Sequence, residues 1–138
     1  MIFDLSKTNS IANTFIAELR DEKIQLDSMR FRRNLERMGE IFAYEMSKSL
    51  EYVVREVTTP LGIAEVPVLK DQPIVGTILR AGMPLHQGIL NFFDQADNAF
   101  ISAYRKHHKD GSFEINRSFR YFLKLAGWVS GKSMYSSK

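Results

Sequence analysis

The sequence contains no cysteine, which excludes disulfide bonds and thiolate metal sites. It has no apolar run of about 18 residues, the length that a membrane-spanning helix needs. Asp4 falls within the first few residues, where a signal peptide would begin its apolar core. These absences predict a cytoplasmic protein. The chain has 138 residues, 44% of them hydrophobic, which suffices for one globular domain with its own core.

Acidic residues are also absent after Glu114. The formal net charge of +3 therefore arises in the tail, which interleaves cations with aromatic side chains: Arg117, Phe119, Arg120, Tyr121, Phe122, Lys124, Trp128, Lys132, Tyr135 and Lys138. Three interpretations stay open. The tail could bind nucleic acid through phosphate contacts and stacking, pack on the body as an amphipathic end, or be a foreign, out-of-frame stretch on a truncated domain. The lack of a recognised binding module counts against nucleic acid.

Two helices are expected near the amino terminus. Thr8-Asn9-Ser10 can cap a helix that runs to about Glu22, and Asp27-Ser28 can cap a longer one. The longer helix has an apolar stripe at spacings of three and four residues: Phe31, Leu35, Met38, Phe42, Met46 and Leu50. The charged residues between them predict a solvated face with ion pairs inside the helix.

Extended segments dominate the rest of the chain. Residues 52–57 and 64–69 are expected to pair as a hairpin around Thr59-Pro60-Leu61-Gly62. A strand that ends at Arg80, a helix over 84–93 and a strand that ends at Arg105 form a crossover unit, which requires parallel strands. A return strand can begin at residues 113–115. This order predicts an α/β fold with a partly parallel sheet.

The segment from Ile74 to Gly88 has the features of an anion-binding site. An apolar strand ends at Arg80, Gly82 lets a ligand approach the backbone, and Pro84 opens a helix whose amino end carries partial positive charge. In parallel sheets, ligands bind at the carboxyl ends of the strands. Arg80 and Arg105 are both expected there, so two cations would converge on one phosphorylated ligand.

The same residues carry a family resemblance. Ile78 to Gly82 with Pro84 and Gly88, followed by Ile101 to Arg105, closely resembles uracil phosphoribosyltransferases. Two flanking matches agree in order: Phe31-Arg32 with Ala43-Tyr44-Glu45, and Thr58 to Leu61. The resemblance covers roughly residues 8–115. It implies a single phosphoribosyltransferase-like domain over residues 1–138 with helices flanking the sheet, incomplete on its carboxyl-terminal side and divergent over residues 116–138.

The resemblance also implies a reaction. Family members transfer ribose 5-phosphate from 5-phosphoribosyl diphosphate to uracil, which yields UMP and pyrophosphate, usually with Mg²⁺. By motif, Arg80, Ala81, Gly82 and Arg105 would bind the diphosphate, and residues 106–113 would form the loop that closes over the substrate. No catalytic residue and no protein metal ligand can be assigned. His86 is expected to be a hydrogen-bonded packing residue, and the pair His107-His108 lacks carboxylate partners for a metal.

One family segment has no counterpart. Its strand, ending in Asp-Pro-Met-Leu-Ala-Thr-Gly-x-Ser, supplies an acid for the ribose hydroxyls and a cradle for the 5-phosphate. Ser130, Gly131, Lys132 and Ser133 resemble only the end of that loop, and the segment that reads uracil is missing. A P-loop is excluded because Ala126 stands where it needs glycine.

These departures leave alternatives open. The chain could be an inactive relative that keeps only diphosphate binding or an oligomer surface, or a nucleic-acid binder through its tail. Without the family's next strand, the strand ending at Arg105 or its neighbour would present an unpaired edge. Unpaired edges join other chains, so a homo-oligomer is expected. No membrane partner is expected.

Overall fold

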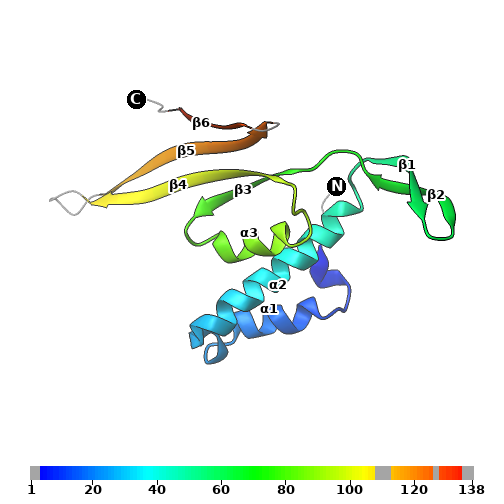
Figure 1. Cartoon of the computed structure of the whole chain (residues 1–138). Coiled ribbons are helices and arrows are strands. Elements are labelled where there is room, and N and C mark those ends of the chain that lie inside the picture. The colour runs from blue at the N-terminus through cyan, green and yellow to red at the C-terminus, as the bar shows by residue number, and fades with distance from the viewer. Residues whose placement is uncertain (1–3, 108–112, 126–127, 135–138) are drawn as a thin grey trace.

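The computed structural model describes residues 4–107, 113–125 and 128–134. At Ser6 and beyond residue 103, the description is limited to the backbone. Figure 1 shows the helices on one side of a curved sheet and a separate hairpin beside them. The helices are α1 (Ala12–Arg20), α2 (Ser28–Ser47) and α3 (Met83–Leu90), with short 3-10 turns at Leu5–Lys7 and Ile24–Leu26. The strands are β1 (Tyr52–Thr59), β2 (Gly62–Leu69), β3 (Ile74–Leu79), β4 (Asp97–His107), β5 (Phe113–Leu125) and β6 (Trp128–Met134).

The predicted cap of α2 is confirmed, whereas the cap position of α1 is Ile11, one residue after the predicted capping segment Thr8-Asn9-Ser10, and has no side-chain cap. The Asp27 carboxylate accepts hydrogen bonds from the amides of Met29 and Arg30 at 3.0 Å each, and so caps α2. The Ser10 hydroxyl accepts from the Ala12 amide at 3.3 Å, at the start of α1. Short polar side chains satisfy amides that the first helical turn leaves without partners, which is why these positions begin helices.

Charged and polar side chains join α1 to α2. Asn34 is buried in α2, and its amide nitrogen donates to Glu18 of α1 at 2.7 Å. Arg30 also pairs with Glu18, at 3.3 Å, whereas Arg33 pairs within its own helix with Glu36 at 2.7 Å. The predicted pairing inside the helix is therefore right for Arg33 and wrong for Arg30, because α1 brings Glu18 within reach.

The buried face of α2 differs in part from the expected apolar stripe. Met38 is buried as predicted, but Met46 is 47% exposed, and Gly39 and Ala43 are buried instead. A Cβ atom at Gly39 would meet the backbone of α3, and one at Gly88 of α3 would meet the Glu36 carbonyl. The two helices thus cross at paired glycines with their backbones in close approach, so small residues rather than large ones define the contact face.

The predicted hairpin is confirmed. β1 and β2 pair antiparallel, from Tyr52 opposite Leu69 to Thr59 opposite Gly62. Gly62 has a φ of +136°, a conformation that favours glycine. In Figure 1 the hairpin extends away from the four-stranded sheet.

The main sheet is partly parallel, with strand order β3-β4-β5-β6. β3 and β4 are parallel, as the crossover predicts, whereas β5 and β6 return antiparallel. β5 pairs with β4 from Phe113 to Phe122, so part of the tail packs on the body and the strand carrying Arg105 has partners on both sides. Its neighbour β3 lies at one edge of the sheet, and β6 lies at the other. The α/β prediction is confirmed.

A small apolar cluster lies between the sheet and the helices. Ala43, Val75, Phe93 and Ala96 are buried, with Ile89 and Leu90 of α3 packed against them. Val75 and Thr77 are the buried residues of β3, while Ile74, Gly76 and Ile78 are exposed on the other face. None of the helices in the described part of the chain is long and apolar enough to cross a membrane.

Candidate functional site

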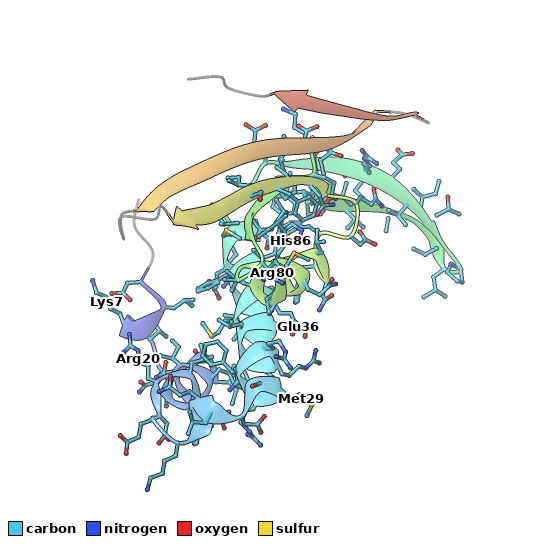
Figure 2. All side chains as sticks on the ribbon, turned by 90° about the vertical axis from the view of Figure 1, so that its left-hand side faces the viewer. Lys7, Arg20, Met29, Glu36, Arg80 and His86 are labelled. Atoms are coloured by element: carbon cyan, nitrogen blue, oxygen red, sulfur yellow. The ribbon has the colours of Figure 1, made fainter. Side chains whose placement is uncertain are left out.

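Arg80 occupies the turn between the carboxyl end of β3 and the amino end of α3. β3 ends at Leu79, the Leu79–Arg80 peptide bond is cis, and α3 begins at Met83. The Arg80 side chain is exposed and has no hydrogen bond or ion pair to any residue that the structure describes (Figure 2). A guanidinium in this position can donate two parallel hydrogen bonds to an oxyanion.

Gly82 sits directly on β3. A Cβ atom at this position would collide with the hydroxyl of Thr77 and lie 3.1 Å from the Ile78 carbonyl oxygen. Its φ of −76° is open to any residue, so the requirement for glycine comes from the close approach and not from the backbone angle. Thr77 is only 8% exposed, and its hydroxyl lies against Gly82 in the turn. Thr77 was not among the predicted site residues, although a hydroxyl at an inward-facing position of an apolar strand could have indicated a polar contact there.

The backbone of the turn is already internally hydrogen-bonded. The Gly82 amide donates to the Ile78 carbonyl at 3.1 Å, and the Met83 amide donates to the Arg80 carbonyl at 3.2 Å. Pro84, near the start of α3, has no amide hydrogen. Fewer amides are therefore open to an anion than the sequence suggested, and the Arg80 side chain becomes the main donor of the turn.

Arg105 lies on β4, the parallel neighbour of β3. Leu79, the last residue of β3, pairs with Ser102, and Arg105 follows three positions later, opposite Ile115 of β5. β4 continues to His107, so the prediction that this strand ends at Arg105 is wrong by two residues, because β5 extends the pairing beyond the end of β3. The backbone of Arg105 lies beyond the carboxyl end of β3, the end at which Arg80 follows. That the two cations share one ligand stays a prediction.

Ser130 to Ser133 lie in β6 and not in a turn between a strand and a helix. They pair in register with residues of β5, from Leu123 opposite Ser130 to Arg120 opposite Ser133. β6 is at the far edge of the sheet from β3, roughly 14 Å away at the usual strand spacing. The structure does not bring this segment next to the Arg80 turn, and its role in binding a 5-phosphate stays a prediction.

His86 is a buried, hydrogen-bonded residue, as expected. It is 3% exposed, and its Nε2 lies 2.7 Å from the Asn98 side-chain oxygen. Its ring centroid is 5.3 Å from that of Phe100. His107 ends β4 and His108 lies outside the described residues, so the structure leaves that pair untested. Within the described ranges, no three His, Asp or Glu residues lie close enough to hold a metal ion.

The residues with shifted pKa values lie on α1, α2 and the turns that border them. Arg33 lowers the pKa of Glu36 through a hydrogen bond and an ion pair, and the Asn91 amide adds to this effect. Asn91 ends α3 and donates to Glu36 at 3.3 Å and to Glu40 at 2.8 Å. These carboxylates hold the distal end of α3, at the opposite end of the helix from Arg80.

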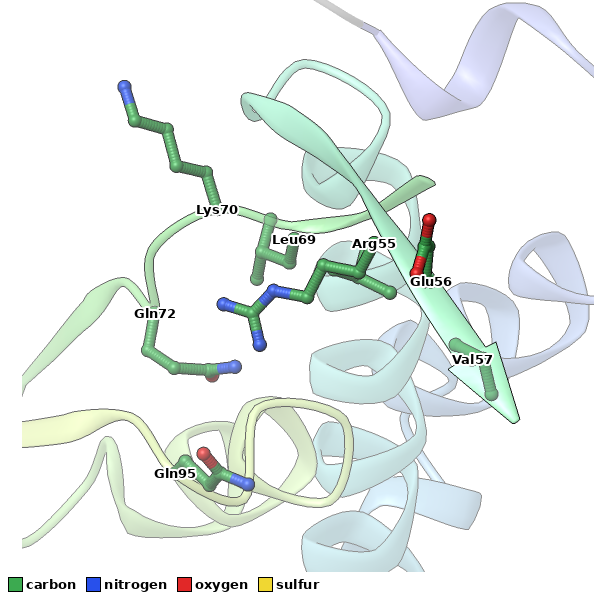
Figure 3. A pocket seen from close by; sticks show the side chains of 8 residues that line it. Arg55, Glu56, Val57, Leu69, Lys70, Gln72 and Gln95 are labelled. Atoms are coloured by element: carbon green, nitrogen blue, oxygen red, sulfur yellow. The ribbon is translucent and has the colours of Figure 1, made fainter. Parts of the chain in front are cut away.

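A cavity of about 460 Å³ opens at the amino ends of β3 and β4, the opposite end of these strands from the Arg80 turn. It is lined by residues of the hairpin and of the turns before β3 and β4: Arg55, Glu56, Val57, Val68, Leu69, Lys70, Gln72 and Gln95. Figure 3 shows the Arg55 side chain extending from β1 toward Gln72. The sequence did not predict this cavity, because its lining comes from two strands and two turns that are separated along the chain.

Known proteins resemble this chain over most of its length. The sequence profile described as uracil phosphoribosyltransferase matches residues 6–125, past position 115 where the resemblance was expected to end. A uracil phosphoribosyltransferase of Porphyromonas gingivalis is 51% identical over 115 residues, which is 83% of this chain and 53% of that protein. One from Pyrococcus furiosus is 33% identical over 106 residues, 75% of this chain and 44% of that protein.

A solved structure shares the fold. The AQ2163 protein from Aquifex aeolicus superposes with a TM-score of 0.67 at 22% identity, over 84% of this chain and 54% of that one. This chain thus spans about half the length of the relatives that it matches.

Proposed function

This chain belongs to the uracil phosphoribosyltransferase family, and we propose that it binds the diphosphate of 5-phosphoribosyl diphosphate at the Arg80 turn and transfers the ribose 5-phosphate to uracil. The products are UMP and pyrophosphate. One observation carries the proposal. Arg80 presents an exposed guanidinium, without a partner in the described part of the chain, at the carboxyl end of β3 beside the strand that carries Arg105.

The chemistry explains why cations serve this reaction. The bond between the ribose C1 and the diphosphate oxygen breaks, the bond from C1 to a uracil nitrogen forms, and that nitrogen loses its proton. Negative charge gathers on the departing diphosphate, so groups that bind it more strongly in the transition state accelerate the step. Arg80 would grip the diphosphate oxygens in a bidentate manner, with Ala81 and Gly82 allowing close approach and Arg105 acting from β4.

Mg²⁺ is proposed to accompany the diphosphate. The turn offers a guanidinium, which binds phosphate oxygens but cannot ligate a cation. Mg²⁺ commonly binds through substrate phosphates while it keeps several waters. The ion would then neutralise diphosphate charge, and the side chains of the turn would orient the remaining oxygens.

A second candidate is diphosphate binding without turnover. The chain spans about half the length of its relatives, and no acidic residue follows Glu114, so the acid that the family uses for the ribose hydroxyls has no counterpart in this sequence. This candidate predicts Arg80-dependent binding of pyrophosphate and no UMP.

The test is UMP formation from uracil, 5-phosphoribosyl diphosphate and Mg²⁺ by the purified chain, followed by separation of nucleotide from base. Turnover that disappears in Arg80→Ala would support the enzyme. Pyrophosphate binding that depends on Arg80, without UMP, would support the second candidate. If pyrophosphate binding is equal in the chain and in Arg80→Ala, the anion site itself is wrong.

We also propose one cytoplasmic domain that forms a homo-oligomer. The hairpin supports this, because Val54 is 67% and Ile63 is 72% exposed, and a two-stranded hairpin alone has marginal stability in water. Light scattering tests it. A monomer would contradict the proposal. A lower molecular mass in solution for the Val54→Lys, Ile63→Lys double variant than for the parent chain would assign the contact between copies to the hairpin.

A further inference from the structure

His86 and Asn98 form a polar contact between α3 and the sheet. His86 lies on α3 and Asn98 on β4, and the His86 Nε2 atom is 2.7 Å from the Asn98 side-chain oxygen. The Asn98 amide nitrogen donates to the Ala96 carbonyl at 3.2 Å. That second bond fixes the orientation of the Asn98 amide, so its oxygen faces the imidazole.

The orientation of Asn98 determines the tautomer of His86. An amide oxygen can only accept a hydrogen bond, so Nε2 donates, and in the neutral imidazole Nδ1 is then the bare acceptor. The Nδ1 atom is buried and has no hydrogen-bond partner among the described groups. An unpartnered buried acceptor disfavours the folded state. An apolar residue of similar size would avoid this cost, so the Nε2 bond calls for an explanation beyond packing.

The contact links α3, which follows the Arg80 turn, to β4, which carries Arg105. The His86 amide donates to the Gly82 carbonyl at 3.0 Å, so His86 lies one helical turn after Gly82. On the other side, Asn98 is the second residue of β4, the strand that continues to Arg105. Figure 2 labels Arg80, in the turn after β3, and His86, in α3. The bond therefore ties the start of α3 to β4 across the layer between them.

We propose that His86 and Asn98 are a positioning pair for the diphosphate site. Their hydrogen bond sets the placement of the Arg80–Gly82 turn relative to β4, and it does so without touching the ligand. The inference rests on the proposed function and adds to it two residues that lie inside the fold. A tight, directional bond suits this role, because hydrogen bonds depend on angle whereas apolar packing tolerates sliding.

The experiment measures pyrophosphate affinity by titration calorimetry on the full chain. His86→Leu removes the donor and leaves the Asn98 oxygen unpaired, so we expect affinity to fall about tenfold. His86→Gln offers an amide N–H to Asn98 and should recover most of the affinity. Phe93→Leu is the matched control, since Phe93 is also buried beside α3, in the apolar cluster with Ala43 and Ala96, and has no side-chain hydrogen bond to lose; we expect it to bind pyrophosphate within about twofold of the parent chain.

Two results would overturn the inference: wild-type affinity in His86→Leu, or an equal loss in Phe93→Leu. Failure of the proposed function is recognised separately, because pyrophosphate binding would then be absent or indifferent to Arg80→Ala. In that case hydrogen exchange at the Gly82 and Met83 amides decides. Faster exchange in His86→Leu, about tenfold, that His86→Gln does not show supports the positioning role, and unchanged exchange refutes it.

Discussion

Arg80 and Arg55 are both exposed arginines whose side chains have no hydrogen bond or ion pair in the described part of the chain, and they lie at opposite ends of β3 and β4. Arg80 extends from a turn that two backbone hydrogen bonds and the buried Thr77 hold in place. Arg55 extends from a hairpin whose two faces are largely exposed, into a cavity shared with Glu56. Charge and exposure are alike at the two sites, but the backbone at Arg80 packs closely on β3, whereas the backbone at Arg55 belongs to a largely exposed hairpin.

On this difference we expect Arg80 to be the better anion site. A cation whose supporting backbone is held by packing loses less conformational freedom on binding than a cation on an exposed hairpin. Three predictions follow in order of decreasing effect: the first compares the two arginines, the second tests the support beneath Arg80, and the third tests the far end of α3.

Removing each arginine gives the largest contrast. Arg80→Ala should weaken pyrophosphate binding by about ten- to a hundredfold, the usual contribution of charge-assisted hydrogen bonds. Arg55→Ala should leave the affinity within about twofold, since it lies at the other end of the sheet. Titration calorimetry of both variants measures this. A greater loss in Arg55→Ala would reverse the assignment of the two sites.

Adding a methyl group to each of two glycines tests the support beneath Arg80. Gly82→Ala should destabilise the fold by about 1–3 kcal/mol, because the new Cβ collides with Thr77. Gly76→Ala on β3 is the control, since its Cβ would meet nothing closer than 3.9 Å. Urea unfolding followed by circular dichroism gives both values. Equal stability in the two variants would mean that the turn does not rest tightly on β3.

Acid should loosen the distal end of α3 before it affects the Arg80 turn. Arg33 and Asn91 lower the pKa of Glu36 below its ordinary value of 4.5 in the folded chain. A carboxyl with a lowered pKa stabilises the fold fully above its unfolded pKa, and this stabilisation is lost as the pH falls through the folded pKa. The melting temperature should therefore decline below about pH 4.5, and less steeply in Glu36→Gln. An identical decline in Glu36→Gln would exclude Glu36 as a cause.

Local signals in the sequence were sufficient for several elements. Asp27 predicted the start of α2 because an N-cap is a contact between near neighbours. The hairpin and the parallel order of β3 and β4 followed from turn residues and from the length of the crossover. Arg80 could be placed at a strand end for the same reason, since alternation and a following Gly-x-Pro are local features.

Other features depended on distant partners. The glycine crossing of α2 and α3 buried Gly39 and exposed Met46, because the contact face is set by how closely two helices approach. Arg30 pairs with Glu18 of α1 and not with a residue of its own helix, because α1 packs beside α2. The sequence suggested only that a return strand could begin near Phe113, whereas β5 runs to Leu125 and pairs with β4.

The sequence by itself determined the cap of α2, the hairpin, the crossover and the arginine at the end of β3, because each rests on contacts or periodicities spanning a few residues. Tertiary structure alone decided that Thr77 supports Gly82, that His86 meets Asn98, and that Arg55 faces a cavity at the other end of the strands. These contacts join residues from different elements, and their geometry follows from how closely those elements pack.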